Sequence, residues 1–313
     1  MDVSLDGKVA LVTGAGPNIG SGIALALSRY GAKVACNDLD KPAAEAAVRR
    51  LSRNGGEGLV LSGDVSVEAD VVANIRAVLD AWGRIDIVVN NAAWLHACGI
   101  LEEDLASFNR AITIAVNGNF LYTKHAALAM IERDIRGSFV SILSSNAWQG
   151  AAGFIAYATH KGALANFVRA AAMDLAPYGI RVNSFTPTAP NPDNPELLAQ
   201  WKREGRTPFG LRPGTTGGLG APEGTNEEWR KPARFDGPRN PMVPMGTTGT
   251  PTDIGHAVAW LCSDYARLIS GIDLVVDGGA RAKNFAYIPA APADLAGPLP
   301  LITLDNTPMP DGL

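Results

Sequence analysis

Short apolar runs alternate along the chain with longer segments in which apolar residues recur at the spacing of a helix. This alternation is typical of βαβ units, whose parallel strands are buried on both faces and are therefore apolar throughout. It predicts a single doubly wound α/β domain, with helices on both faces of a parallel sheet and ligands beyond the carboxyl ends of the strands. About seven strands are expected, at residues 9–12, 33–36, 58–61, 85–89, 138–143, 181–185 and 273–276. Helices are expected at residues 23–30, 41–54, 68–82, 101–114, 120–135, 157–176 and 252–263.

Proline interrupts this rhythm in two places. Residues 187–245 contain eleven of the 21 prolines, and residues 281–313 contain six. Such a long connection is rare in a compact domain unless it is a lid over a site or a disordered insertion. We interpret 187–245 as an extended Pro/Gly-rich substrate lid, with a mostly disordered insertion as the alternative, and 281–313 as a proline-rich tail to a domain of residues 1–280. The lid aromatics that favour packing are Trp201, Phe209, Trp229 and Phe235.

Composition excludes several classes of protein. Hydrophobic residues make up 47% of the chain and charged residues only 19%, too apolar a balance for intrinsic disorder. The net charge of −4, without a polybasic run, opposes a nucleic-acid partner or an anionic membrane surface. The acidic start has no signal-peptide pattern, and no long uncharged apolar run follows. We therefore expect a cytoplasmic protein with neither a nucleic-acid nor a membrane partner.

Cysteine and histidine spacing gives no sign of a metal. The cysteines are odd in number and lack C-x-x-C spacing, which predicts neither a disulfide framework nor a thiolate zinc site. Buried free thiols in a reducing compartment are the simpler interpretation. The four histidines also lack metal-ligand spacing, so no catalytic metal is expected. The residues concerned are Cys36, Cys98, Cys262, His96, His125, His160 and His256.

A glycine-rich segment, from Thr13 to Gly20, follows the first expected strand and leads into a helix. In such a turn backbone N–H groups approach a pyrophosphate at the positive end of the helix, because no side chain intervenes. Asp38 stands 24 residues after Gly14, at the end of the second strand, where a carboxylate can bind both ribose hydroxyls of an adenosine. That carboxylate would repel a 2′-phosphate, which predicts NAD rather than NADP. A solvated acid at a strand end is the alternative interpretation of Asp38.

A second group of polar residues has the chemistry of proton transfer. Tyr157 and Lys161 are four residues apart and therefore share one face of the expected helix. A nearby ammonium favours phenolate, which lowers the pKa of a tyrosine toward the range useful for acid/base work on an alcohol or ketone. Ser144 stands thirteen residues before Tyr157, at a strand end, where its hydroxyl could bind the same substrate oxygen. Taken alone, the Y-x-x-x-K spacing also occurs by chance in many helices.

Together these features resemble the short-chain dehydrogenase/reductase family over about residues 5–280. That family has a Rossmann-type fold, so the resemblance implies a single dinucleotide-binding catalytic domain. The individual motifs are weak, but they occur in the family's order and at compatible spacing. The matching pieces are Thr13–Gly20, Asp38, Asp64-Val65, Asn90-Asn91-Ala92, Ser144, Tyr157, Lys161, Arg181-Val182-Asn183 with Pro187, and Asp277-Gly278-Gly279.

The resemblance implies roles for individual residues. Tyr157 would donate or accept the proton, Lys161 would lower its pKa and bind the nicotinamide ribose, and Ser144 would orient the substrate oxygen. The cofactor, NAD, would supply the hydride chemistry, and the chain would supply orientation and proton transfer. The phosphates of the cofactor would lie at Gly14, Asn18, Ile19 and Gly20. Its adenine and adenosine ribose would lie at Asp38, Asp64, Val65, Asn91 and Ala92. Pro187 would begin the segment that cups the nicotinamide.

The chain departs from the family pattern at four positions. Asn18 replaces the middle glycine of the phosphate turn, an exchange that suits a positive φ better than most. Ala93 and Thr188 replace further glycines. A proton-relay asparagine of the family falls at Ala115 in a gapless alignment, with Asn117 two residues later on the opposite face of a regular helix. Unless the helix bulges, Asn117 cannot replace the relay directly, and it is then a polar residue at a helix end.

The substrate wall in this fold comes from residues after the fourth and fifth strands and from the lid. Those residues are unusually aromatic for a chain with 7% aromatics, which predicts a bulky, apolar or aromatic secondary alcohol or ketone. An ordinary core role is the alternative for each of them. The wall candidates are Trp94, Asn146 and Trp148, with Leu95, His96 and Phe154 nearby.

Three functions remain open at this point. The first is an NAD-dependent oxidoreductase that acts on a CH–OH/C=O pair through Tyr157. The second is a 3-oxoacyl-thioester reductase, which would prefer NADPH, and the third is a dinucleotide-binding protein without catalysis. In each case the resemblance implies a homodimer or homotetramer paired through the helices at 120–135 and 157–176.

Overall fold

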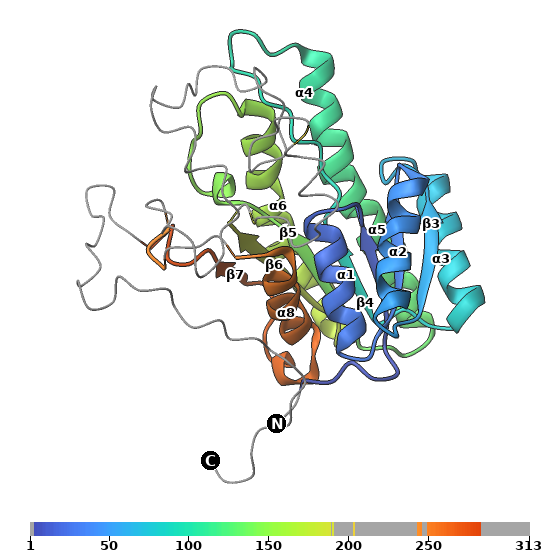
Figure 1. Cartoon of the computed structure of the whole chain (residues 1–313). Helices are drawn as coiled ribbons and strands as arrows, with labels where there is room; N and C mark the ends of the chain where they lie inside the picture. Colours follow the sequence, from blue (N-terminus) through green and yellow to red (C-terminus); the bar gives the residue numbers. More distant parts are fainter. Residues whose placement is uncertain (1–2, 189, 191–202, 204–242, 246–248, 283–313) are drawn as a thin grey trace.

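The computed structural model describes residues 3–188, 190, 203, 243–245 and 249–282 (Figure 1). Most of the predicted lid, including its four aromatic residues, and nearly all of the predicted tail lie outside these residues. Among the described residues, no helix is long and apolar enough to span a membrane.

The core of the protein is a parallel sheet of seven strands, as predicted, and their order is β3-β2-β1-β4-β5-β6-β7. The strand order reverses between β1 and β4, the neighbours from which the two halves of the sheet are wound. At such a reversal the loops leave a crevice at the carboxyl ends of the strands. The strands are β1 (Val9–Thr13), β2 (Lys33–Asp38), β3 (Gly58–Ser62), β4 (Ile87–Asn90), β5 (Ser138–Ile142), β6 (Arg181–Pro187) and β7 (Asp273–Val276).

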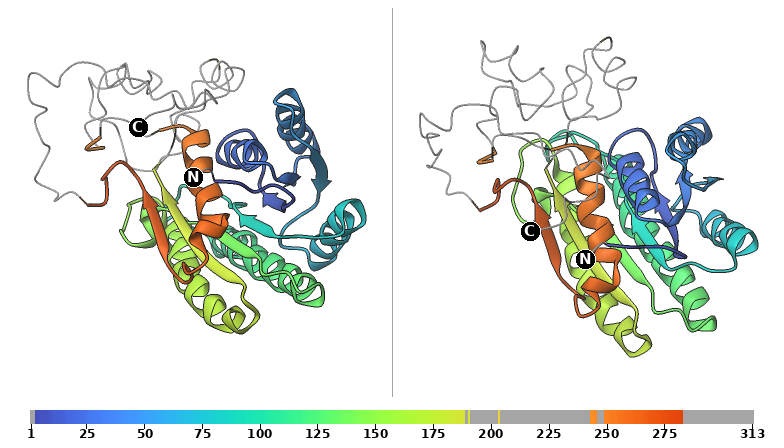
Figure 2. Two further views of the ribbon diagram at one scale, coloured as in Figure 1. Left: turned by 90° about the horizontal axis from the view of Figure 1, so that it is seen from below. Right: turned by 60° about the horizontal axis from the view of Figure 1, so that its bottom comes forward.

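Two layers of helices cover the sheet (Figure 2). The core on one face is built with α1, α2 and α8, and the core on the other with α3, α5 and α6. The α-helices are α1 (Ile19–Arg29), α2 (Lys41–Arg53), α3 (Glu68–Trp82), α4 (Leu105–Ile112), α5 (Gly118–Glu132), α6 (Ile155–Leu175) and α8 (Pro251–Cys262). Short helical turns are η1 (Thr113–Asn117), η2 (Ser145–Ala147), η3 (Ala176–Tyr178) and η5 (Asp264–Ala266).

Local sequence explains where these helices start and which face they bury. In α2, Pro42 lies in the first turn, where its missing N–H is harmless, and the buried residues Ala44, Ala47 and Leu51 recur at helical spacing. In α8, Thr250 and Asp253 form a reciprocal capping box. Helix α2 therefore begins where proline leaves one backbone donor fewer to satisfy, and α8 begins where the capping box satisfies its donors.

Two helix boundaries differ from the prediction. The helix expected at 23–30 begins at Ile19, because the glycines at the start are part of the helix rather than breaks in it. The helix expected at 101–114 begins only at Leu105, where the Asp104 carboxylate caps the N–H of Ser107 at 2.9 Å. It then continues through the π-helical turn η1 directly into α5.

Helices α1 and α8 pack unusually closely because each contributes a glycine to the contact. A Cβ atom on Gly22 would overlap Pro251, and one on Gly255 would overlap Ala26. The helix that follows the glycine-rich turn is therefore in direct contact with the start of α8.

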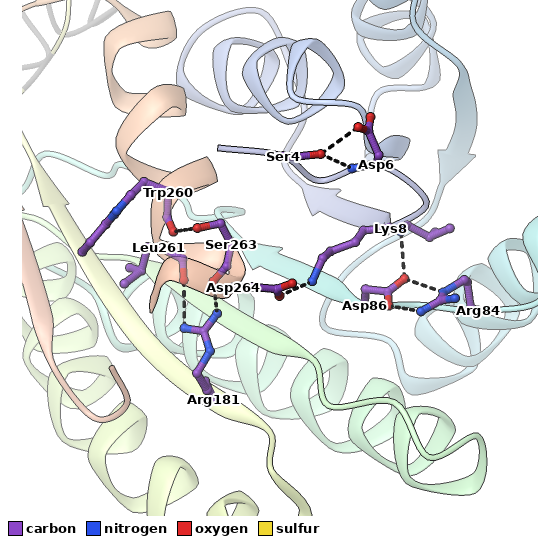
Figure 3. Close-up of polar contacts among 11 residues, drawn as sticks. Ser4, Asp6, Lys8, Arg84, Asp86, Arg181, Trp260, Leu261, Ser263 and Asp264 are labelled. Atoms are coloured by element: carbon purple, nitrogen blue, oxygen red, sulfur yellow. Dashed lines mark hydrogen bonds and ion pairs between the residues drawn. The ribbon is translucent and has the colours of Figure 1, made fainter. Parts of the chain in front are cut away.

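Polar contacts fix the end of the sheet at which the strands begin, opposite the carboxyl ends of the strands (Figure 3). The Arg84 guanidinium donates two hydrogen bonds to Asp86, at 2.6 and 2.9 Å, and Asp86 accepts the N–H of Val9 at 2.9 Å. Lys8 pairs with Asp264, and the Arg181 guanidinium donates to three backbone carbonyls. This edge is held by its own side chains, whereas the candidate site lies at the carboxyl edge.

Candidate active site

The glycine-rich turn between β1 and α1 needs its glycines for steric reasons. Gly14 has a φ of +59°, and a Cβ atom there would lie 2.9 Å from the Cα atom of Ala92. A Cβ atom on Gly20 would overlap the carbonyl of Gly14. The turn thus brings bare backbone to the amino end of α1, the arrangement that holds a phosphate.

Residues after β4 fix this turn from the side. The Asn91 amide donates to the carbonyls of Gly14 at 2.8 Å and Thr13 at 3.2 Å. The backbone N–H groups of Asn91 and Ala92 in turn donate to the hydroxyl of Thr13. Asn91 and Ala92 therefore contact the turn itself, at the reversal point of the sheet.

Asn18 occupies the middle-glycine position with a negative φ. Its φ is −110°, so the tolerance of positive φ expected for an asparagine there is not needed. Its Oδ1 atom is buried and has no hydrogen-bond partner among the described residues. This acceptor, at the amino end of α1, suits a hydroxyl of a bound nucleotide.

Asp38 ends β2 beside the turn. One carboxylate oxygen accepts the N–H of Gly16 at 2.9 Å and the other accepts the N–H of Asp40 at 3.0 Å. Burial raises the pKa of Asp38, and these backbone donors oppose that effect in part. The carboxylate is thus fixed beside the glycine-rich turn.

Two further predicted cofactor residues follow β3. Asp64 is half-buried and accepts two hydrogen bonds from Ser66, at 2.6 and 2.8 Å, while Val65 is buried against Gly118. Pro187 lies farther along the same edge, at the end of β6 opposite Val276. The bare turn, the free acceptor of Asn18 and the Asp38 carboxylate together fit an adenine dinucleotide.

The predicted acid/base residues come together between the end of β5 and the first turns of α6. The Ser144 hydroxyl accepts the N–H of Asn146 at 3.2 Å, and its interaction with the phenol of Tyr157 lowers the pKa of that phenol. Lys161 is buried, and its Nζ atom donates to the carbonyl of Ile142 at 2.6 Å. The same Nζ atom lies 5.6 Å from the centre of the Tyr157 ring.

Burial dominates the electrostatics of this group. Burial lowers the pKa of Lys161 to about 8 and raises the pKa of Tyr157. The interaction with Ser144 opposes the rise in the pKa of Tyr157. The sequence predicts that Lys161 lowers the pKa of Tyr157. In the structure the ammonium is directed at the Ile142 carbonyl, so the desolvation of the phenol outweighs its effect.

His160 lies between Tyr157 and Lys161 in the sequence, and its side chain is buried. Its ring packs edge-on against that of Tyr157, with 4.9 Å between the ring centres. Burial and the Lys161 charge lower the pKa of His160 to about 3. Neither ring nitrogen has a hydrogen-bond partner among the described residues. A neutral ring is therefore part of the wall behind Tyr157.

The helix before Phe120 does bulge, at the π-helical turn η1. Asn117 is exposed at the end of this turn, and its placement does not support the expected relay role. The buried amide is Asn119, which donates to the carbonyl of Ala115 at 2.8 Å and accepts the hydroxyl of Ser141 at 2.6 Å. The sequence reasoning missed Asn119, although its four-residue spacing from Ala115 placed both residues on one face.

The predicted substrate residues have different surroundings. Trp94 stacks on His96, with ring centres 4.5 Å apart, and Arg110 lies 4.8 Å from the Trp94 ring. Phe154 lies 6.3 Å from Tyr157, ring centre to ring centre. Asn146 is half-buried in η2, two residues after Ser144.

Trp148 is directed toward β7 instead. It is 41% exposed, and its indole N–H donates to Asp273 at 3.2 Å. Arg169 and Arg281 lie over its ring, at 5.6 and 5.2 Å from the centre. Cationic and acidic neighbours hold this indole, whereas Phe154 is the predicted wall aromatic that lies beside Tyr157.

Comparison with known proteins decides the family. Residues 8–202, more than half of the chain, match a family model described as short chain dehydrogenase. The chain belongs to the short-chain dehydrogenase/reductase family. Residues 227–281 match a second model, described as Enoyl-(Acyl carrier protein) reductase. Members of the short-chain dehydrogenase/reductase family are oxidoreductases that bind a nicotinamide dinucleotide, NAD or NADP.

Relatives within the short-chain dehydrogenase/reductase family cover nearly the whole chain. It is 33% identical to 2-(S)-hydroxypropyl-CoM dehydrogenase 3 of Xanthobacter autotrophicus, over 90% of this chain and 100% of that protein. It is 32% identical to D-threitol dehydrogenase of Mycolicibacterium smegmatis, over 90% and 96%. A solved short-chain type dehydrogenase/reductase from Mycobacterium marinum is similar, with 27% identity, a TM-score of 0.72 and coverage of 90% and 98%.

Proposed function

We propose that the protein is an NAD-dependent oxidoreductase that interconverts a secondary alcohol and a ketone. The observation that carries the proposal is the placement of Ser144, Tyr157 and Lys161 together at the carboxyl edge of the sheet. The glycine-rich turn and Asp38 lie on the same edge, at the ends of β1 and β2. A dinucleotide held by the turn and a substrate oxygen at Tyr157 would therefore share one crevice.

The chain's own part in the cofactor site is to hold and orient. Gly14 and Gly20 leave the backbone free for the phosphates, and Asn91 keeps the turn in that shape. Asp38 would accept hydrogen bonds from the adenosine ribose hydroxyls. The bound dinucleotide supplies the hydride chemistry.

The choice of NAD over NADP rests on Asp38. Its carboxylate is fixed by Gly16 and Asp40, and no basic side chain pairs with it among the described residues. A 2′-phosphate beside this carboxylate would meet like charge in a partly desolvated place, which is unfavourable. We therefore assign NAD as the cofactor.

Proton transfer is assigned to Tyr157. Its phenol would donate a proton to a ketone oxygen during reduction and accept one from the alcohol during oxidation. Ser144 interacts with the phenol and would hold the substrate oxygen beside it. Lys161, while charged, favours phenolate by its proximity, and it loses that charge above about pH 8.

For the substrate we propose a bulky, apolar or aromatic secondary alcohol or ketone. Phe154 beside Tyr157 and the stacked pair of Trp94 and His96 support this class. The names of two relatives, 2-(S)-hydroxypropyl-CoM dehydrogenase 3 and D-threitol dehydrogenase, point to other alcohols. Substrate size is therefore the quantity to measure first.

The test is turnover on a panel of secondary alcohols and ketones, followed by NADH absorbance. We expect an aromatic carbinol to have a higher kcat/KM with NAD than threitol does, and NADP to support much slower turnover. Equal or better turnover of the polyol would overturn the substrate class and leave the reaction class standing. Equal turnover with NADP would overturn the assignment of the cofactor.

A thioester reductase is the second candidate, because the carboxyl-terminal match is to a model described as a reductase of acyl carrier protein substrates. Adding a 3-oxoacyl thioester with NADPH to the same panel separates the two. A chain that turns over only that pair would fit the second candidate. A chain that binds NADH but turns over nothing would fit a non-catalytic role.

We also propose a homodimer or homotetramer that pairs through α5 and α6. Phe120, Leu128 and Ile131 are exposed on α5, within an arc of about 80° at 100° per residue, and Met173 is exposed on α6. Light scattering on the full chain and on Leu128→Glu tests this pairing. A smaller mass for the variant supports it, whereas a monomeric parent protein would overturn it.

A further inference from the structure

A histidine, a cysteine and a glutamate come together in the loop between β4 and α4. Ligand atoms of His96, Cys98 and Glu103 all lie within 4.8 Å of one another. The spacing of the histidines alone gives no sign of this grouping, because the three residues come from one irregular loop. The loop is tied to the start of α6, where Cys98 pairs with Phe154 and its carbonyl accepts the N–H of Ile155 at 3.3 Å.

The surroundings of Glu103 are a second observation that points to a bound ligand. Its side chain is only 4% exposed, and neither carboxylate oxygen accepts a hydrogen bond among the described residues. The Nε2 atom of His96, 3.4 Å from Oε1, could at most pair with one of the two oxygens. A buried carboxylate without donors is costly, and a bound cation is one of the few ways to offset that cost.

We propose that His96, Cys98 and Glu103 form a zinc site, with one position left for a water molecule. Imidazole nitrogen and cysteine sulfur are ligands that zinc prefers, whereas magnesium and calcium prefer oxygen alone. Tetrahedral ligands at about 2.0–2.1 Å from zinc stand about 3.4 Å apart. The separation of His96 Nε2 and Glu103 Oε1, 3.4 Å, already has this value.

The charges around Cys98 agree with a cation site. Burial and the neighbouring Glu103 and Glu102 carboxylates raise the pKa of the Cys98 thiol. A cation among these carboxylates reverses that effect and makes the thiolate a ligand, with release of a proton.

The position of the site assigns it a structural role that does not depend on the proposed function. The backbone bridge between Cys98 and Phe154 ties the ligand loop, which also carries Trp94, to the start of α6, one turn before Tyr157. Zinc at this point would fix the substrate side of the crevice without contacting the reacting oxygen. The expectation that no catalytic metal is present is compatible with such a site.

The test uses the full chain without an affinity tag, stripped of metal with a chelator and kept reduced with a phosphine. Zinc is then titrated against a chromophoric competitor, and cobalt(II) is added separately to detect the absorption band of a thiolate ligand. We expect one zinc per chain and a thiolate band. The variants Cys98→Ser and Glu103→Gln should each weaken binding by about tenfold or more.

Glu102→Gln is the matched control, because it removes a neighbouring charge of the same loop but no proposed ligand. It should keep one zinc per chain and the thiolate band. Cys36 and Cys262 are buried, so maleimide should label mainly Cys98. Zinc should slow that labelling in the parent protein. The absence of stoichiometric zinc, or binding unchanged in Cys98→Ser, would overturn the site and leave only a His96–Glu103 ion pair.

Discussion

The side-chain amide of Asn119 donates to the backbone carbonyl of Ala115 over 2.8 Å, across the π-helical turn that interrupts the long helix. The same amide accepts the hydroxyl of Ser141 from β5. One buried side chain therefore joins the irregular turn to the strand that leads to Ser144.

Replacing Asn119 should destabilise the protein. Asn119→Ala leaves the buried hydroxyl of Ser141 without its acceptor and removes one of the donors to the Ala115 carbonyl, which should lower the free energy of unfolding by about 1–3 kcal/mol. Asn117→Ala is the control, since that side chain is exposed, and it should change stability by about 0.5 kcal/mol or less. Urea unfolding of both variants measures the difference. A larger loss of stability or turnover in the Asn117 variant would restore Asn117 as the important amide.

Removing the phenol hydroxyl should abolish most turnover without loss of dinucleotide binding. Acid/base catalysis by one side chain contributes about 10²–10⁴-fold, so Tyr157→Phe should lower kcat by at least about 100-fold. Tyr178→Phe, at an exposed site in η3, should leave kcat unchanged. Stopped-flow turnover and NADH fluorescence titration separate the two effects. Unchanged turnover in the Tyr157 variant would show that another group transfers the proton.

The buried Lys161 should make stability depend on pH. Its pKa falls from 10.5 to about 8 on folding, so below about pH 8 the folded protein bears the full cost of a buried ammonium. Between about pH 8 and 10.5 the folded state is neutral while the unfolded chain still binds a proton, and the cost shrinks as pH rises. The stability of the parent relative to Lys161→Met should therefore increase by about 2–3 kcal/mol between pH 7 and pH 10.

Urea unfolding at a series of pH values provides this measurement. Lys124→Met is the reference for a lysine that is largely exposed, and its difference from the parent should vary little over the same range. A parent-to-Lys161→Met difference that stayed flat from pH 7 to pH 10 would mean that Lys161 is not desolvated in the folded protein.

Asp38 should decide between the two dinucleotides. A hydrogen bond to a charged group contributes about 1.5–3 kcal/mol, and about 1.4 kcal/mol is a tenfold change, so Asp38→Ser should raise the KM for NAD about tenfold or more. The same change removes the repulsion of a 2′-phosphate and should lower the KM for NADP. Asp40→Ser, two residues later and exposed, should alter neither value greatly. A fall in affinity for both dinucleotides alike would indicate that Asp38 only holds the turn through Gly16.

The strands and most helices follow from the sequence for a physical reason. Parallel strands buried on both faces must be apolar throughout, so runs such as that of β1 stand out from amphipathic helices such as α2. Ser144, Tyr157 and Lys161 could also be grouped in advance, because a strand end and one helix face place them.

Other features depend on contacts that have no sequence period. A π-helical turn shifts the helix face within a few residues. Regular helical spacing therefore could not predict that Asn117 is exposed and Asn119 is buried. The grouping of His96 with Glu103 arises in an irregular loop, where distance along the chain says little about distance in space. Trp148 is aromatic like Trp94, yet Asp273 and two arginines decide its direction.

The close contact between Gly22 and Pro251 has a consequence for engineering the protein. The chain between β6 and α8 leaves from a strand of the sheet and returns against the helix of the phosphate turn, so both of its attachment points are fixed. Closing a connection between fixed points costs only about 0.6 kcal/mol more for each doubling of its length. We therefore expect that lengthening this connection costs little stability, because its two attachment points stay in place.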